Sequence, residues 1–387
     1  MPINPDPTPG QASTPKEEGA PRKAQREKLH VLVVDDSAMV RQVMQAILQT
    51  DARISVSVAA DPLIAGGKMQ KERPDVIITD LEMPRMDGLT FLRKIMAESP
   101  LPVVICSGLA AKGTELALRA LEEGAVEVIT KPKIGVREFL HESAVLLLDV
   151  VWSAAEARIL PRQTISAAPR LTADAVLPLR IKSREWSVSH GLIAVGASTG
   201  GTEALRVFLS AMPLNCPPIV VVQHMPEKFT RAFADRLDRE CMIDVSEASD
   251  GVQLRNGLAL IAPGNFHLLV NRNATSLVVN VMDGPLVSRH RPSVDVLFRS
   301  VAVAAGPNAV GVIMTGMGDD GAEGLREMKE AGAATIAQDE ATCVVFGMPR
   351  EAICRRAVDF VVPLERIARQ ALNSLNIERT HQEQVQT

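Results

Sequence analysis

The sequence predicts an α/β protein of two domains, each built on a parallel, doubly wound sheet. Two observations predict this class. Short runs rich in valine and isoleucine alternate with stretches whose apolar residues recur at helical spacing, and this alternation occurs twice, over residues 29–147 and 190–376. Strands joined through helices pair in parallel, because a parallel pair needs a crossover connection. The 387 residues, 46% of them hydrophobic, are enough for two domain cores.

The first domain is expected to contain five strands. Between the first two, the apolar residues from Met39 to Leu48 recur every three or four positions, which is typical of a helix packed against a sheet. The apolar runs of the five strands are VLVV, ISVSV, VIITD, PVVICSG and VEVIT.

The second domain shows the same alternation with an interruption. Its parallel strands are expected at LIAVGAS, PIVVVQH, AVGVIMTG, ATIAQD and DFVVP. An insert around QLRNGLALIAP and FHLLVNRNATSLVVNV is typical of hairpins, so the sequence predicts an antiparallel addition to this sheet.

Three segments lack this periodicity. Residues 1–28 combine proline, glycine and mixed charge, so we expect a disordered N-terminal tail. Residues 148–189, rich in proline and alanine, are expected to form the linker between the domains. Residues 377–387 are expected to form a C-terminal tail.

Composition excludes several classes of protein. The five cysteines are scattered and form no C-x-x-C pair, which argues against a disulfide framework and a zinc site. No leader-like segment and no apolar run of the roughly 18 to 20 residues that span a bilayer is found, so we expect a cytoplasmic protein without membrane insertion. A net charge of −4 provides no basic field for nucleic acid.

Polar side chains follow the strands of the first domain where these leave the sheet. Asp35 and Asp36 follow the first strand, Asp80 ends the third, Ser107 ends the fourth and Lys131 follows the fifth. Ligands of open parallel sheets bind at the carboxyl ends of the strands, so these side chains should meet. Clustered carboxylates repel one another unless a cation lies among them, and hard oxygen ligands suit Mg²⁺. We therefore expect the three carboxylates to bind Mg²⁺, with Asp80 as a nucleophile toward a phosphoryl group and with Ser107 and Lys131 on the phosphoryl oxygens.

A glycine-rich turn follows the first strand of the second domain, in LIAVGASTGG. The turn places Ser198 at a strand end just before a helix, and G-A-S-T-G fits the pattern of a nucleophile elbow. It equally suits phosphate binding by the amides of a helix N-terminus, or a structural turn. The segment alone leaves these alternatives open.

A nucleophilic serine needs a base, and His224 ends the strand PIVVVQH. His290, in SRHRPSVD, is the rival, because this loop enters a helix that could reach the same edge. The strand AVGVIMTG is followed by Asp319 and Asp320. Either carboxylate is a candidate to orient the imidazole and to stabilise its charged form.

The first group of residues, together with the loop EMPRMDG after Asp80, closely resembles the receiver domain of two-component response regulators. The resemblance covers about residues 29–147 and implies a flavodoxin-like domain. It also implies Asp80 as phosphoacceptor, Mg²⁺ bound near Asp35 and Asp36, and a histidine kinase as phosphodonor. Receivers usually carry an aromatic residue three positions before the lysine. This chain carries Val128 there and contains no tyrosine, so the resemblance does not extend to an aromatic rotamer switch at this position.

The motifs GASTGG, QHMP, RPSVD and MTGMGDDG, in this order behind a receiver, resemble the catalytic domain of the chemotaxis protein-glutamate methylesterases. The resemblance implies a Rossmann-like domain without a cofactor of its own. It also implies Ser198 as nucleophile, His224 as general base and Asp320 as the orienting acid. Many members carry Asn-Asp where this chain carries Asp319 and Asp320, and we expect the additional carboxylate to be solvated.

The same resemblance implies that the protein hydrolyses glutamate methyl esters on methyl-accepting chemotaxis receptors to glutamate and methanol, and deamidates specific glutamines. We expect the oxyanion to be bound by amides near Thr199 and in the loop 316–318, above all that of Met317. Arg289 and Arg291 are candidate contacts for acidic receptor helices.

We further expect the unphosphorylated receiver to cover the serine and phosphorylation to uncover it. The alternative is a non-catalytic response regulator whose second domain binds a partner or a phosphate ligand.

Overall fold

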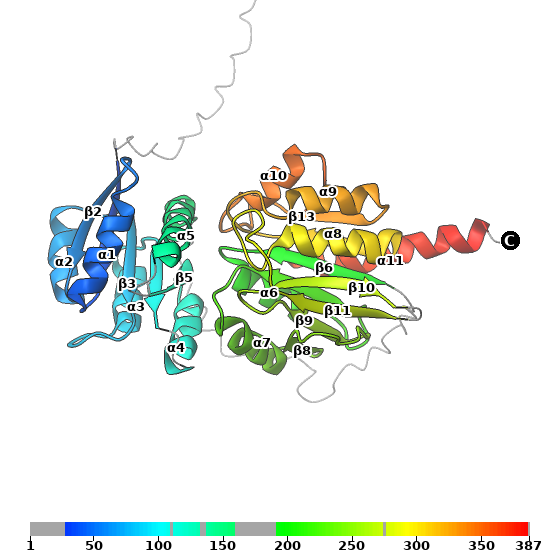
Figure 1. The fold of residues 1–387 in the computed structure, drawn as a ribbon, viewed down its shortest axis with the longest axis horizontal. Coiled ribbons are helices and arrows are strands. Elements are labelled where there is room, and N and C mark those ends of the chain that lie inside the picture. Colours follow the sequence, from blue (N-terminus) through cyan, green and yellow to red (C-terminus); the bar gives the residue numbers. More distant parts are fainter. Residues whose placement is uncertain (1–27, 109–110, 132–136, 159–190, 274–275, 386–387) are drawn as a thin grey trace, which may run out of the picture.

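The computed structural model describes residues 28–108, 111–131, 137–158, 191–273 and 276–385. Figure 1 shows two α/β bodies side by side, each with helices packed around a sheet. The predicted fold class is confirmed. Nearly all of the tail predicted at residues 1–28, and most of the linker predicted at 148–189, lie outside the described residues. In the described ranges, no helix combines the length and the apolar character needed to cross a membrane.

The N-terminal domain contains a parallel sheet with the strand order β2-β1-β3-β4-β5. Its strands are β1 (Leu29–Val34), β2 (Ile54–Ala59), β3 (Val76–Asp80), β4 (Val103–Ser107) and β5 (Glu127–Thr130). Its helices are α1 (Ala38–Leu48), α2 (Pro62–Lys71), α3 (Gly88–Glu98), α4 (Ala111–Glu122) and α5 (Arg137–Glu156). The order reverses between β1 and β3, and such a switch point is where open sheets of this kind bind ligands.

Side-chain caps explain where several of these helices begin. Ser37 precedes α1, and its hydroxyl accepts a hydrogen bond from the amide of Val40 at 3.4 Å. Asp61 and Asp87 cap α2 and α3 in the same manner. The central strands β3 and β4 are buried along their whole length, as expected for parallel strands covered on both faces.

The C-terminal domain contains a larger parallel sheet with the order β14-β13-β12-β6-β7-β9-β8. Its strands are β6 (Leu192–Ala197), β7 (Ile219–Gln223), β8 (Asp244–Glu247), β9 (Leu258–Ile261), β12 (Ala309–Ile313), β13 (Ala334–Gln338) and β14 (Phe360–Val362). Its helices are α6 (Gly201–Ser210), α7 (Phe229–Glu240), α8 (Val294–Ala304), α9 (Ala322–Glu330), α10 (Met348–Cys354) and α11 (Leu364–Val385). Because β6 lies between β7 and β12, the chain segments that follow these three strands leave the sheet side by side.

The antiparallel addition is smaller than predicted. Strands β10 (His267–Arg272) and β11 (Leu277–Met282) form a two-stranded antiparallel sheet, as expected. The assignment of QLRNGLALIAP to the hairpins is wrong, because its residues Leu258–Ile261 form β9, which pairs in parallel with β7 and β8. All four residues of β9 are buried, so the strand is a continuous apolar run without the alternation of a hairpin.

Helix α5 continues beyond the predicted domain boundary at residue 147. It extends to Glu156, inside the predicted linker, because Leu147, Val151 and Ala154 recur at helical spacing and are buried. Just after it, the backbone amide of Arg158 donates a hydrogen bond to a carbonyl of the C-terminal domain, that of Val344, at 3.1 Å. At the other end of the chain, α11 runs through most of the predicted tail at 377–387.

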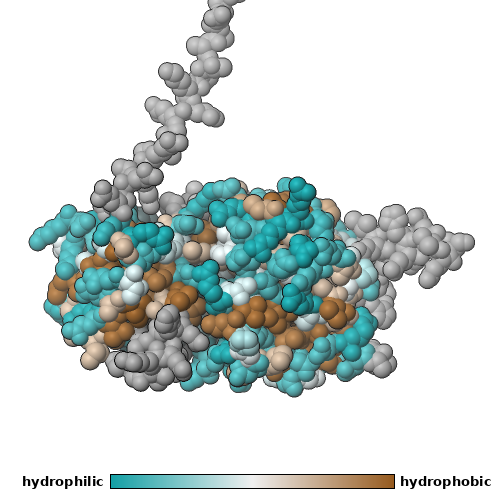
Figure 2. Space-filling model, turned by 45° about the horizontal axis from the view of Figure 1, so that its top comes forward, coloured by the Kyte–Doolittle hydropathy of each residue, from teal (hydrophilic) through white to brown (hydrophobic). Residues whose placement is uncertain are grey.

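The two domains pack against each other. Leu118 of α4 belongs to a buried apolar cluster of the C-terminal domain, and Phe229 of α7 belongs to one of the N-terminal domain. Arg236 of α7 pairs with Glu122 of α4 at 2.6 Å. Figure 2 shows a mostly hydrophilic outer surface with apolar patches on both bodies. The N-terminal domain is therefore docked on the C-terminal domain through apolar side chains as well as charges.

Candidate functional site

The residues predicted to form the phosphoryl site converge at the carboxyl edge of the first sheet. Asp35, Asp36 and Asp80 place carboxylate oxygens within 4.8 Å of one another. Nζ of Lys131 lies 2.7 Å from Oδ2 of Asp80 and 3.1 Å from Oδ2 of Asp35. Ser107 is buried at the end of β4, the neighbour of β3.

Burial dominates the electrostatics of this cluster. It raises the pKa of Asp80, which Lys131 opposes and Asp35 reinforces. Burial alone would lower the pKa of Lys131, but the two carboxylates hold it above its ordinary value. One ammonium therefore offsets only part of the negative charge. The hard oxygen atoms of Asp35, Asp36 and Asp80 fit Mg²⁺, which would offset the remainder.

Ser198 lies in the tight turn between β6 and α6 and is only 9% exposed. Gly200, two residues on, has a φ of 78°, a conformation that favours glycine. The amide of Ser198 donates to the carbonyl of Thr315 at 3.0 Å, and its carbonyl accepts from the amide of Gly201 at 2.7 Å. The same carbonyl accepts from the side-chain amide of Gln223 at 2.9 Å. These bonds fix the turn to the ends of β7 and β12.

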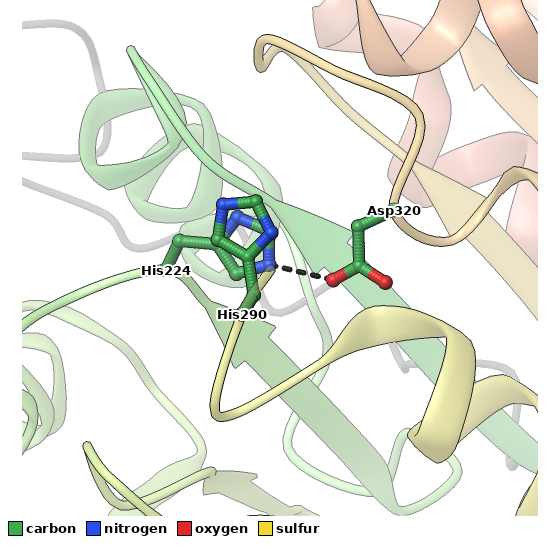
Figure 3. Close-up of side chains that lie close together, drawn as sticks. All are labelled: His224, His290 and Asp320. Carbon is green, nitrogen blue, oxygen red and sulfur yellow. Dashed lines mark hydrogen bonds and ion pairs between the residues drawn. The ribbon is translucent and has the colours of Figure 1, made fainter. Parts of the chain in front are cut away.

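His224 and Asp320 form a buried pair, with Nε2 of the histidine 2.8 Å from Oδ2 of the aspartate (Figure 3). The hydroxyl of Ser293 donates to Oδ1 at 2.7 Å, and the amides of Val294 and Asp295 donate to Oδ2 and Oδ1 at 2.7 and 3.1 Å. These donors begin α8, where aligned backbone dipoles favour a negative charge. Burial opposes ionisation of Asp320, but His224 and these donors hold its pKa below the ordinary value.

The position of the proton on His224 follows from this pair. An ionised carboxylate only accepts hydrogen bonds, so Nε2 carries the proton and Nδ1 carries the lone pair. Nδ1 is buried and has no hydrogen-bond partner within the described residues. His224 and Ser198 line the same cavity, but in the described ranges no hydrogen bond joins the serine hydroxyl to Nδ1. Contacts of this kind commonly tighten only when substrate binds.

His290, the rival base, lies against the face of His224. The ring centroids are 3.7 Å apart and the planes differ by 3° (Figure 3). Nδ1 of His290 donates to the carbonyl of Ser288 at 2.7 Å. Burial, and to a smaller extent His224, lowers the pKa of His290 to about 3. The ring of His290 is therefore neutral. The imidazole that is hydrogen-bonded to Asp320 is that of His224.

Thr199 and Met317 are the residues whose amides the sequence suggests as oxyanion donors. Both residues line the same cavity as the serine, and neither amide donates a hydrogen bond within the described residues. The amide of Gly316, in contrast, donates to the carbonyl of Val345 at 3.0 Å, so it is not available to a ligand. A Cβ on Gly316 would lie 2.7 Å from Cβ of Ser198, so only glycine lets this loop approach so closely.

Other charged residues near the site have partners of their own. Asp319 pairs with Arg355 at 2.5 Å and its side chain is 48% exposed, in agreement with the expectation of a solvated carboxylate. Arg291 pairs with Asp283 at 2.8 Å, which leaves it less available as a contact for an acidic helix. Arg289 pairs with Asp149 of α5 in the N-terminal domain at 3.1 Å.

A cavity of about 370 Å³ lies between the domains and includes Ser198. Its wall from the N-terminal domain includes Glu127 and Val128 of β5. The hydroxyl of Thr199 accepts from the hydroxyl of Ser153 in α5 at 2.9 Å and donates to Oε2 of Glu127 at 2.9 Å. Burial raises the pKa of Glu127 to about 7. The N-terminal domain therefore contacts the residue directly after Ser198.

Sequence reasoning missed three residues of this site. Gln223 directly precedes His224, and its signal was a polar residue at the end of a buried strand. Ser293 lies inside the motif RPSVD, and its signal was a polar residue just before a helix. Glu127 gave a weaker signal, a lone carboxylate in the apolar run VEVIT. Its partner lies 72 positions away, in the other domain.

Two family models match the chain, one over each domain. Residues 31–141 match the family model of the response regulator receiver domain, and residues 193–371 match that of the CheB methylesterase. The catalytic domain of the Thermotoga maritima CheB methylesterase, a solved structure, is 38% identical, covers 48% of this chain and 98% of its own, and has a TM-score of 0.47.

Two curated relatives match almost the whole chain. Protein-glutamate methylesterase/protein-glutamine glutaminase 3 of Geobacter metallireducens is 59% identical over 349 residues, which are 89% of this chain and 98% of the relative. Protein-glutamate methylesterase/protein-glutamine glutaminase 2 of Rhodospirillum rubrum is 56% identical over 359 residues, which are 90% of this chain and 99% of the relative. The chain therefore belongs to the family of the protein-glutamate methylesterases/protein-glutamine glutaminases, in which a receiver domain precedes a CheB methylesterase domain.

Proposed function

We propose that this protein is a phosphorylation-activated serine hydrolase that acts on chemoreceptors in chemotaxis adaptation. It converts glutamate methyl esters to glutamate and methanol, and it deamidates specific glutamines. The observation that carries the proposal is the buried pair of His224 and Asp320 beside Ser198, at three adjacent strand ends of a chain that also contains a receiver.

The proposed reaction is an acyl transfer in two steps. Oγ of Ser198 attacks the γ-carbonyl carbon of the substrate while Nδ1 of His224 takes the serine proton. His224 returns this proton to the leaving group, methanol from an ester or ammonia from an amide. Water then attacks the acyl-enzyme, again with His224 as base, and the products are glutamate and free Ser198. Asp320 remains ionised throughout and stabilises the charged imidazole.

We propose that the amides of Thr199 and Met317 bind the oxyanion that forms in each step. The support is that both residues line the cavity at Ser198 and that neither amide is engaged elsewhere in the described part of the chain. Donors that are fixed before the reaction stabilise the developing charge without reorganising.

We propose that the receiver controls access to this site. Asp80 accepts the phosphoryl group from a histidine kinase, and Asp35, Asp36 and Asp80 would hold the Mg²⁺ that this transfer uses. Mg²⁺, when bound, offsets the negative charge of the phosphoryl oxygens.

Lys131, which now pairs with Asp80, follows directly on β5, and β5 also carries the Glu127 that touches Thr199. A displacement of Lys131 can therefore be transmitted along β5 to the contact between Glu127 and Thr199. A shift from mostly covered to mostly open needs only a few kcal/mol of differential stabilisation, roughly what one phosphate and its hydrogen bonds supply.

The test is hydrolysis of methyl-labelled receptor membranes by wild type and Ser198→Ala in ¹⁸O water. Wild type should release methanol and place ¹⁸O in the product glutamate, and Ser198→Ala should do neither above background. Ser210→Ala, on the same helix α6 but exposed, is the matched control and should behave as wild type. Equal methanol release by wild type and Ser198→Ala would contradict the proposal and favour a binding module.

A further inference from the structure

His290 has a place in the site that the proposed acyl transfer does not yet use. Its ring covers one face of His224 at a centroid distance of 3.7 Å with nearly parallel planes (Figure 3). The edge of the His224 ring is held at Nε2 by Asp320. A ring held at one edge and covered on one face cannot tilt toward that face without displacing its neighbour.

His290 is itself fixed. Its backbone amide donates to the carbonyl of Val287 at 2.9 Å, and its carbonyl accepts from the amide of Val287 at 3.1 Å. Its Nδ1 donates a hydrogen bond to the carbonyl of Ser288. The turn is tight, because Ser288 and Arg289 have φ values of 49° and 68°. Three residues after His290, Ser293 binds Asp320. One segment, residues 287–294, therefore fixes both the partner of the His224 edge and the cover of its face.

Two other roles of His290 fit the geometry less well. As a base, His290 would act through Nε2, because its Nδ1 donates to Ser288. The orienting carboxylate, however, binds His224, and burial lowers the pKa of His290 to about 3, which makes it a weak base. The cluster of His224, His290 and Asp320 also has the composition of a metal site. A metal lies in the plane of each imidazole that binds it, and two parallel planes stacked face to face share no such position.

The chemistry of the acyl transfer gives the stack a second consequence. His224 becomes a cation each time it takes a proton, at the wall of the cavity between the domains. A neutral aromatic face stabilises a cation placed against it, whereas a second charged imidazole would repel it. His290 is kept neutral by its burial.

We propose that His290 is a positioning residue, which holds the ring of His224 in line with Ser198 and stabilises its charged form by stacking. The inference rests on the proposed function. It assigns to His290 an effect on the chemical step and none on substrate binding, so kcat and KM should respond differently.

The test compares His290→Leu with His290→Phe in the full-length protein, using methanol release from methylated receptor membranes at saturating phosphodonor and Mg²⁺. Leucine fills space without a flat face, and phenylalanine restores the flat neutral face without the nitrogen atoms. We expect His290→Leu to lower kcat about tenfold, with KM within about twofold of wild type. His290→Phe should recover most of this loss.

Val303→Ala is the matched control, because Val303 lies on α8, the helix that residues 287–294 lead into, and is 86% exposed. Under these conditions it should leave kcat unchanged. Thermal unfolding of each variant shows whether it is folded. Equal activity of His290→Leu and wild type, or equal losses in the leucine and phenylalanine variants, would overturn the inference. If Ser198→Ala is as active as wild type, the proposed function fails instead.

Discussion

Asp320 is the residue on which the polar contacts of the serine site converge. It binds His224, the hydroxyl of Ser293 and two amides of α8, and its pKa is held below the ordinary value. In Asp320→Asn the side chain is neutral and also carries a donor, so it no longer fixes the proton of His224 on Nε2.

We expect Asp320→Asn to lower kcat by on the order of 10³-fold, measured as methanol release. Asp319→Asn is the control, because Asp319 is half exposed and pairs with Arg355. It should leave kcat close to that of wild type. Comparable losses in the two variants would mean that the orienting acid is misassigned.

At the residue scale, sequence reasoning found the side chains that follow strand ends. Ser198 and His224 directly follow buried parallel strands, and Asp320 lies in the loop after β12; the topology of such sheets brings these strand ends together. The stacking of His290 could not be predicted in this way. The stacking depends on a turn in which Ser288 and Arg289 have positive φ. Serine and arginine rarely adopt this conformation, so the sequence does not predict it.

At the element scale, the N-terminus of α8 holds the site together. Ser293 caps this helix through the amide of Val296 and also donates to Asp320. Ser293→Ala should lower the free energy of unfolding by about 1 kcal/mol through the lost cap. It should also lower kcat roughly tenfold, because the buried carboxylate loses a strong donor. Chemical denaturation and methanol release measure the two effects, and a loss of stability with unchanged kcat would show that the cap has a purely structural role.

The loop after β12 also helps to form the site, and its close approach to Ser198 requires glycine at position 316. A Cβ on Gly316 would lie 2.7 Å from that of Ser198, so Gly316→Ala should push the loop from the serine and lower kcat at least about tenfold. The overpacking should cost about 1 to 3 kcal/mol of stability.

Gly66→Ala, in α2, is the control for this variant, because nothing lies within 4 Å of the added Cβ. It should raise stability by about 0.4 to 1 kcal/mol and leave hydrolysis unchanged. Thermal unfolding separates the two variants. If Gly316→Ala keeps full activity, the loop is not as close to the serine in solution as in this structure.

The elements themselves were largely predictable, since long apolar runs alternating with helical patterns determined the two sheets. Two of the strands were not. β9 resembled part of a hairpin, because a turn signal, Asn256-Gly257, precedes it. The edge strand β8 is short and polar, with the sequence DVSE, so it offers no apolar run to recognise. Pairing with a neighbour, rather than local pattern, makes these segments strands.

At the scale of the whole molecule, docking of the two domains should depend on pH. Burial at the interface raises the pKa of Glu127 to about 7 from an ordinary value of 4.5. The groups that face it are the hydroxyl of Thr199 and its own backbone neighbour, the amide of Val128. The docked state therefore binds a proton that the separated state releases. Docking should be strongest below about pH 4.5, weaken as the pH rises from there through about 7, and level off at higher pH.

Small-angle scattering or limited proteolysis of the linker, between about pH 4.5 and 8, measures this opening independently of catalysis. Glu127→Gln, which stays neutral, should remove the dependence on pH. If wild type and Glu127→Gln respond identically, Glu127 does not govern docking. The sequence could not predict this contact, because it depends on how two separately folded domains meet.

We propose that phosphorylation of Asp80 uncovers the serine hydrolase site, and the rate of methanol release with and without a small phosphodonor and Mg²⁺ measures this uncovering. The phosphodonor should raise the rate of wild type about tenfold or more, the change expected for a site that is mostly covered beforehand. Asp80→Asn should show no increase. An unchanged wild-type rate, or an equal increase in Asp80→Asn, would mean that phosphorylation of Asp80 does not control the site.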